Sequence, residues 1–281
     1  VAWCQPILAR AESLPELAVP RAHLYSVLGW SAIFSGNHKL ARTAAETGLS
    51  LATRSADQKE IIHLQVVALV SAMYLGDYPA AQQAAQAGEA LARQLGYTDE
   101  LAMLLVLGGQ IRYFASGDMT QAKINLAEAE SLTIDSDSKW ASSTFIFGFA
   151  RLTGILGNID KARALFKQTE NNAQRLGNMR IVYSCHSELA HMLRRHGEID
   201  EALGLYLGVL PKWRELGHRS AVAHELECIA FILVQRDQPD RAVTLLGAAE
   251  ALRELIDSRM TNPERTEYEQ VLSSLHTQLD E

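Results

Sequence analysis

The stretch GEIDEA, from Gly197 to Ala202, decides the fold, because its turn residue and its alanine recur at a constant distance along the chain. The five other copies of this spacing begin at Gly36, Gly76, Gly117, Gly157 and Asp237. Successive copies start 40 or 41 residues apart, and each has its alanine five residues after the turn residue. A period of about 20–50 residues predicts a solenoid or another array of similar units.

Each unit has the pattern of two helices. The segment that precedes Gly197, IVYSCHSELAHMLRR, is rich in apolar residues, whereas the segment that follows Gly157, DKARALFKQTENNAQRL, is amphipathic. We expect the glycine to end the first helix, because a left-handed residue at that position has no steric cost without a Cβ atom. The alanine is small because the two helices must approach closely where it lies. These residues therefore build the fold and carry no chemistry of their own.

Small residues also recur on both sides of the turn. Seven positions before the turn lie Gly29, Ala150, Ala190 and Ala230, and seven positions after the repeated alanine lie Gly48, Gly88, Ala129, Thr169 and Ala249. This pattern resembles the tetratricopeptide repeat (TPR) in a form of about 40 residues, over residues 21–256. The resemblance implies an all-α fold: a TPR-like α-solenoid, a right-handed superhelix of six helix-turn-helix repeats plus terminal helices. It also implies a concave groove that binds partners.

The two ends depart from the repeat. Residues 1–20 contain one short helical segment, ILARAES, which we interpret as part of a preceding repeat. Because residue 1 is Val, we expect the chain to come from a longer protein. Residues 257–281 are predicted to form a loop and a C-terminal capping helix, whose N-terminus Asn262 and Pro263 cap. That helix carries an apolar stripe of Tyr268, Val271, Leu272 and Leu275, and a solenoid needs a polar-faced helix to cover its last repeat.

A second resemblance concerns the last repeat and the helix after it. The segments RAVTLLGAAEALRE, from Arg241, and PERTEYEQVL, from Pro263, are similar to the C-terminal part of the repeat region of MalT-like and LuxR-type ATP-dependent transcriptional regulators and related signalling ATPases. In that bacterial family the repeats are a sensor or partner-binding arm beside a nucleotide-binding switch. The resemblance implies signal transduction and transcription regulation, with this chain as the binding arm.

Composition narrows the class of protein. The 281 residues are 48% hydrophobic and 21% charged, and the net charge is −7. This acidic balance argues against direct, non-specific nucleic-acid binding, which requires clustered positive charge. The three cysteines are too few for a disulfide framework, so we expect a reducing, cytoplasmic location. No apolar run reaches the roughly 18 residues of a membrane span.

The sequence shows no catalytic motif. It contains neither a Gly-rich phosphate loop nor a nucleophile motif, and HELEC, from His224, lacks the second histidine of a zinc-protease helix. His186, His191 and His196 are five residues apart, which separates neighbours by roughly 140° around a helix. They cannot bind one metal ion from one helical face. We therefore predict no enzyme activity, no catalytic residue, no metal site and no cofactor.

The candidate binding residues come from the helical face that TPR proteins turn into the groove. This face is apolar in the second and third repeats and carries imidazole or guanidinium groups in the others. It supplies ten candidate residues: His23, Trp30, His63, Val66, Val70, Leu107, Arg151, His191, Arg194 and His224. Such a face suits a partner with a hydrophobic body and an anionic end. The structural alternatives are a register error of one residue, a groove that closes on itself, or a dimer contact.

The functional prediction follows from the repeat and from the absence of motifs. We expect a ligand- or protein-binding sensor or regulatory domain of a larger bacterial signalling or transcription-regulating protein. Its partner would be a protein, a peptide or a small molecule in the concave groove, with no membrane contact; a homo-oligomer is a further option. The alternative is a constitutive protein–protein scaffold that senses nothing.

Overall fold

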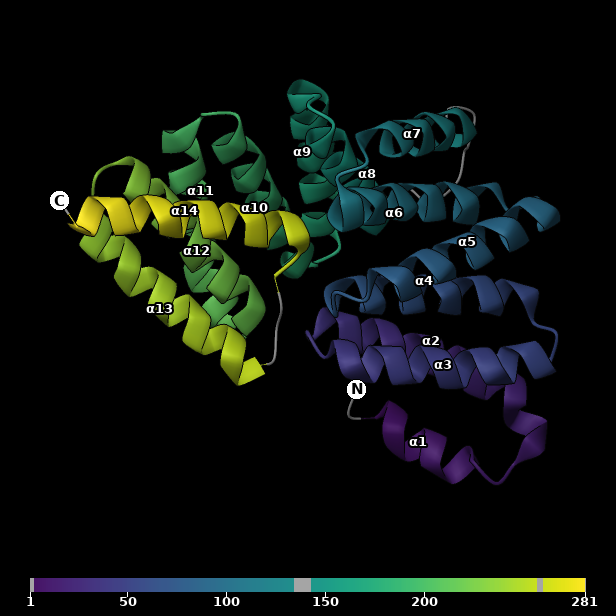
Figure 1. The fold of residues 1–281 in the computed structure, drawn as a ribbon. Helices are drawn as coiled ribbons and strands as arrows, with labels where there is room; N and C mark the ends of the chain where they lie inside the picture. Colours follow the sequence, from purple (N-terminus) through teal and green to yellow (C-terminus); the bar gives the residue numbers. More distant parts are fainter. Residues whose placement is uncertain (1–2, 134–142, 257–259, 281) are drawn as a thin grey trace. The chain divides into compact units, whose positions relative to one another are not determined.

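The computed structural model describes residues 3–133, 143–256 and 260–280, and nearly all of them are helical (Figure 1). Residues 1–138, hereafter unit 1, contain α1 (Cys4–Ala11), a short 3-10 turn (Pro15–Leu17), α2 (Ala18–Phe34), α3 (His38–Arg54), α4 (Gln58–Tyr74), α5 (Tyr78–Leu95), α6 (Thr98–Ser116) and α7 (Met119–Thr133). Residues 139–281, hereafter unit 2, contain α8 (Ser143–Ile155), α9 (Ile159–Arg175), α10 (Met179–Arg195), α11 (Ile199–Glu215), α12 (Arg219–Gln235), α13 (Pro239–Ile256) and α14 (Asn262–Asp280). No strand occurs in the described ranges, so the predicted all-α repeat fold is confirmed.

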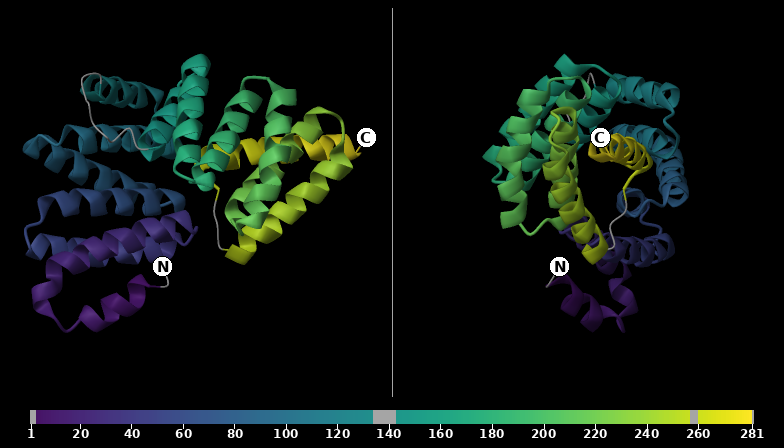
Figure 2. Two further views of the ribbon diagram at one scale, coloured as in Figure 1. Left: turned by 180° about the vertical axis from the view of Figure 1, so that it is seen from behind. Right: turned by 60° about the vertical axis from the view of Figure 1, so that its left-hand side comes forward.

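The chain divides into two compact units, residues 1–138 and 139–281. Within each unit, consecutive helices pair as antiparallel hairpins, which Figure 2 shows from two further sides. First helices of neighbouring hairpins also contact each other: α2 with α4, α4 with α6, and α8 with α10. Every described helix is too short or too polar to cross a membrane.

The turns have the geometry that the repeat predicts. Gly197, which separates α10 from α11, has φ +85°, in the left-handed region that glycine adopts without strain. In the last repeat Asp237 takes the same role with φ +57°, and aspartate is among the few other residues that tolerate this region. The next helix is capped locally in several units; the side chain of Asn37, for example, accepts a hydrogen bond from the backbone N–H of Leu40 at 3.1 Å.

The repeated small residues lie where the helices are closest. All six alanines of the repeated turn motif are fully buried. A Cβ atom added to Gly48 of α3 would lie 2.6 Å from Leu64 Cδ2 of α4, and one added to Gly88 of α5 would lie 2.9 Å from Leu104 Cδ2 of α6. The interpretation of these positions as a tight seam between helices is therefore confirmed.

Candidate functional site

The candidate residues of unit 1 differ in how far solvent reaches them. Val66 is fully buried and Val70 is 7% exposed, because α4 lies between α2 and α6 and contacts both. Trp30 and Leu107 are half-buried, and the Trp30 ring stacks on the next turn of its own helix. His23 is the most exposed of the set, with 55% of its side chain accessible. Of these six candidates, the two imidazoles and the two half-buried apolar side chains are accessible to a partner.

His23 of α2 and His63 of α4 are held by carboxylates at the N-terminal ends of α4 and α6. His23 Nε2 lies 2.9 Å from Asp57 Oδ2, and His63 lies 3.6 Å from Glu60 and 3.9 Å from Glu100. Partial burial raises the pKa of Asp57, but hydrogen bonds from His23 and from a backbone N–H outweigh it and leave that pKa lowered. These contacts between imidazoles and carboxylates link neighbouring repeats.

In unit 2 the candidate residues lie under another part of the same chain. Arg151 of α8 pairs with Glu188 at 3.1 Å. His191 and Arg194 of α10 are only 9% and 6% exposed, and the His224 side chain is 22% exposed. Helix α14 accounts for part of this burial, because it lies across α10 and α12 (Figure 1).

Charged contacts attach α14 to this face. Arg194 of α10 donates to Glu267 Oε1 of α14 at 2.5 Å, and Arg195 lies 3.7 Å from the other oxygen of the same carboxylate. Burial raises the pKa of Glu267, but the hydrogen bond from Arg194 and its charge lower it below the ordinary value. Near the other end of α14, the Gln278 amide donates to the carbonyl oxygen of Val234 at 3.3 Å.

An apolar stripe completes the contact. Leu275 is 3% exposed and belongs to the main hydrophobic core of unit 2, and Tyr268, Val271 and Leu272 pack against that core. The Tyr268 ring meets Phe231 of α12 edge-on, with the ring centroids 6.3 Å apart. The predicted stripe is therefore present. Helix α14 contacts α13, and also the first helix of the last hairpin, α12.

The first turn of α14 is stabilised by a capping box. The backbone N–H of Thr261 donates to Glu264 Oε2 at 2.7 Å, and the N–H of Glu264 donates to Thr261 Oγ1 at 3.4 Å. The expectation that Asn262 and Pro263 cap this helix was wrong, because they are its first two helical residues. The second oxygen of Glu264 points to α12, where it lies 3.7 Å from His224 Nε2.

Beneath the start of α14 lies a cluster of polar groups, hereafter the His–Cys cluster, made of His191, His224 and Cys228. Cys228 Sγ is 3.5 Å from His191 Nδ1 and 4.0 Å from His224 Nε2. The two imidazole centroids are 4.4 Å apart. Tyr206 of α11, which is fully buried, also reaches His191 Nδ1, at 2.8 Å.

A buried ion pair supports the outer side of this cluster. His224 Nδ1 lies 3.4 Å from Glu227 Oε2, and Arg253 of α13 binds both oxygens of Glu227, at 2.5 and 2.7 Å. Burial raises the pKa of Glu227, and the hydrogen bonds from Arg253 and His224 lower it below the ordinary value. Burial also lowers the pKa of His191 well below its usual range. The cluster thus combines a neutral imidazole with an oriented second one.

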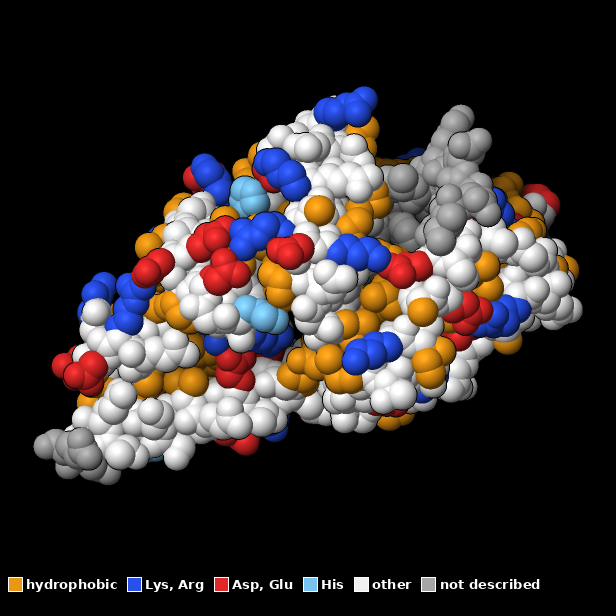
Figure 3. Space-filling view, turned by 90° about the horizontal axis from the view of Figure 1, so that it is seen from above, with side chains coloured by type: hydrophobic (Ala, Val, Ile, Leu, Met, Phe, Trp, Pro, Cys, Tyr) orange, Lys and Arg blue, Asp and Glu red, His pale blue; other side chains and the backbone are white. Residues whose placement is uncertain are grey.

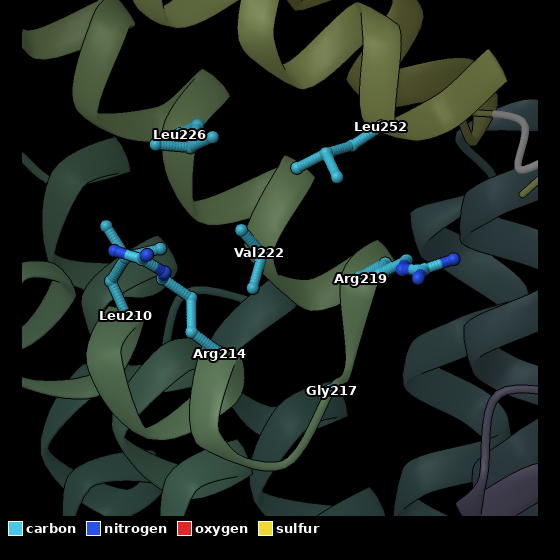
Figure 4. A pocket seen from close by; sticks show the side chains of 7 residues that line it. All are labelled: Leu210, Arg214, Gly217, Arg219, Val222, Leu226 and Leu252. Carbon is cyan, nitrogen blue, oxygen red and sulfur yellow. The ribbon is translucent and has the colours of Figure 1, made fainter. Parts of the chain in front are cut away.

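A separate hollow of unit 2 lies among α11, α12 and α13. It has a volume of about 500 Å³ and an apolar lining of Leu210, Val222, Leu226 and Leu252. Figure 4 shows Arg214 and Arg219 at opposite edges, with Val222 between them. An apolar floor between two guanidinium groups suits a small molecule with an acidic group.

Acidic and basic side chains are mixed on the face of the molecule that Figure 3 shows. They lie next to one another in the left half of this view, with histidines among them. The described atoms of this view form no large patch of one sign. A contact here would select its partner by the pattern of charges and not by overall attraction.

Comparison with known proteins identifies the fold. No protein-family model matches the sequence, and no curated protein matches it. Solved structures do match. The apo form of RapI has a TM-score of 0.63 and 10% identity over 90% of each chain. The Rap conjugation gene regulator of plasmid pLS20, in complex with the Phr* peptide, has a TM-score of 0.67 and 14% identity over 91% of this chain and 68% of that one.

A third structure, a Rap protein complexed with competence and sporulation factor, has a TM-score of 0.59 and 11% identity over 98% of this chain and 81% of that one. These neighbours are TPR-like helical repeat proteins. At such low identity the likeness establishes the fold alone.

Sequence reasoning missed the His–Cys cluster because it compared histidines on one helix. His186 pairs with Glu170 and His196 bonds to a carbonyl of its own helix, so of the three only His191 joins the cluster. Its partners come from the next repeat. The available signal was HELEC, since His224 and Cys228 are four residues apart on one helical face.

Proposed function

We propose that this chain is a protein-binding regulatory module in which the α10–α12 face of unit 2 receives an acidic amphipathic helix. The observation that supports this proposal is α14 itself, which lies on that face through ion pairs and an apolar stripe. A partner helix of the same chemistry would exchange with α14. The module would then have two states, and a partner shifts their populations only by preferring one of them.

The contacts of α14 define the partner. It needs carboxylates three residues apart near its N-terminus, because Glu264 and Glu267 face His224 and Arg194. After these carboxylates, the partner helix needs an aromatic residue and apolar residues at helical spacing, like other helices that bind in a groove.

The comparisons and the resemblance at residues 241–272 support the wider setting. One structural neighbour was solved in complex with a peptide, which is consistent with peptide binding by this chain. We propose a larger bacterial regulator of the MalT-like type, acting in the cytoplasm, in which residues 21–256 form six repeats and act as the sensing arm without catalysis. In unit 1, His23, Trp30 and Leu107 are a second candidate contact area, and the hollow of Figure 4 is a candidate site for a small ligand. A constitutive scaffold, in which α14 never leaves, is the alternative.

A synthetic α14 peptide added to the full chain tests the exchange. The peptide, residues 260–281 with a fluorescent label, competes in the wild-type chain with a tethered copy whose effective concentration is of millimolar order. Leu275→Asp in the full chain should release the tethered helix, because it places a charge in the core. We expect the labelled peptide to bind Leu275→Asp at least about tenfold more tightly than it binds the wild type.

The control peptide carries Lys in place of Glu264 and Glu267, and circular dichroism verifies that the variant chain keeps its helices. The control peptide should bind at least about tenfold more weakly, because it repels Arg194. Equal binding of the two peptides, or no binding of either to a folded Leu275→Asp chain, would refute the exchange. Size-exclusion chromatography distinguishes a second copy of the chain as the donor of the helix, since exchange between copies gives dimers.

A further inference from the structure

The His–Cys cluster has the composition of a metal site. Two imidazoles and a thiol bring their donor atoms within 4.8 Å of one another, from two different helices. Tyr206 already gives His191 Nδ1 a hydrogen-bond partner at 2.8 Å. The approach of Cys228 and His224 to the same point is not needed for that purpose.

We propose that His191, His224 and Cys228 bind one divalent transition-metal ion of the zinc class as its three protein ligands, with water in the fourth position as in other three-ligand zinc sites. Zinc sites are tetrahedral, with about 2.0–2.3 Å from the ion to nitrogen, oxygen or sulfur. Neighbouring donors in such a site are therefore about 3.3–3.8 Å apart. The distances here are 3.5 Å from Cys228 to His191 and 4.0 Å from Cys228 to His224, and all three donor atoms lie within 4.8 Å of one another.

The surroundings of His224 are those of a metal-binding histidine. Such a histidine usually donates its second ring nitrogen to a carboxylate, which fixes the tautomer and the ring orientation. Glu227 lies 3.4 Å from His224 Nδ1, and Arg253 holds it through both oxygens. The lone pair of His224 Nε2 is then free to bind an ion beside Cys228, whose Sγ lies 4.0 Å away.

The donor types select the ion. A thiolate with two imidazoles favours zinc and its neighbours over magnesium or calcium, which prefer oxygen ligands. Binding displaces the thiol proton of Cys228 to solvent. It also requires His191 Nδ1 to be unprotonated and the Tyr206 hydroxyl hydrogen to turn away from it, so that the lone pair of that nitrogen can bind the ion.

Metal binding also has a consequence for the repeats. The three donors belong to α10 and α12. The ion would therefore join the first helices of two neighbouring repeats. Because this site needs no partner, its test is independent of the helix exchange proposed above.

The experiment uses the full chain, stripped with a chelator and titrated with Co²⁺ and then Zn²⁺. We expect one Co²⁺ per chain, a thiolate-to-cobalt charge-transfer band, tetrahedral d–d bands, and loss of all of them when Zn²⁺ replaces Co²⁺. Cys228→Ser should remove the charge-transfer band and weaken binding at least about 100-fold. Cys185→Ser, at the other buried cysteine of unit 2, is the matched control and should leave both unchanged.

One further variant separates ligands from supporting residues. Glu227→Gln should weaken Co²⁺ binding about 10–100-fold with the charge-transfer band retained. If a variant fails to fold, the wild-type titration still decides. Absence of the charge-transfer band in the folded wild-type chain, or its persistence in Cys228→Ser, would overturn the proposal.

Discussion

Adding one methyl group at Gly29 tests the close seam between repeats. Gly29 lies within α2, and an added Cβ atom would be 2.5 Å from Val67 Cγ1 of α4. Val67 is fully buried, and a valine in a helix has one strongly preferred rotamer, so it cannot turn away. Alanine gains about 1 kcal/mol over glycine in a helix interior. Overpacking a core costs about 1–3 kcal/mol. We expect Gly29→Ala to lower the free energy of unfolding by up to about 2 kcal/mol.

The matched control is Gly208→Ala in α11, where an added Cβ atom meets no heavy atom within 4 Å. Only the helix propensity applies there, so this variant should raise the free energy of unfolding by about 1 kcal/mol. Urea unfolding followed by circular dichroism measures both, with hydrogen exchange to assign each change to its unit. If Gly29→Ala stabilised the chain as much as Gly208→Ala, the seam would be loose and the reasoning wrong.

Two further predictions concern buried charges of unit 2. Burial raises the pKa of Glu225 to about 7, from 4.5 in the unfolded chain. The folded state therefore favours the protonated carboxyl, whose contribution to the free energy of unfolding is complete below pH 4.5 and is lost as the pH rises through about 7. Glu225→Gln should remove this loss, making the variant more stable at pH 8 by a difference on the order of 3 kcal/mol that disappears near pH 4 in urea titrations. Arg253→Ala should lower the free energy of unfolding by about 3–5 kcal/mol, because it leaves the Glu227 carboxylate buried without its cation. A loss below about 1 kcal/mol in calorimetry would show that water reaches Glu227.

The residues that form the repeat could be predicted because their effects are local. A glycine such as Gly197 reverses the chain by its own backbone conformation, and an alanine such as Ala202 allows close approach by its own size. The surroundings of the binding face were harder to predict from the sequence. The position of His191 along the helix was predictable, but its surroundings include Tyr206 of α11 and Cys228 of α12, which are 15 and 37 positions away.

By itself, the sequence determined the helical repeat, its period, the positions of its turns and the small residues at its seams, because a 40-residue spacing constrains each unit independently of the others. The tertiary structure alone decided where α14 lies and which histidines meet. Helix α14 carries an apolar stripe that could pack against several faces, and its choice depends on the pairing of Glu267 with Arg194 and of Tyr268 with Phe231. Such contacts join residues about 40–70 positions apart, and their geometry exists only once the hairpins have stacked.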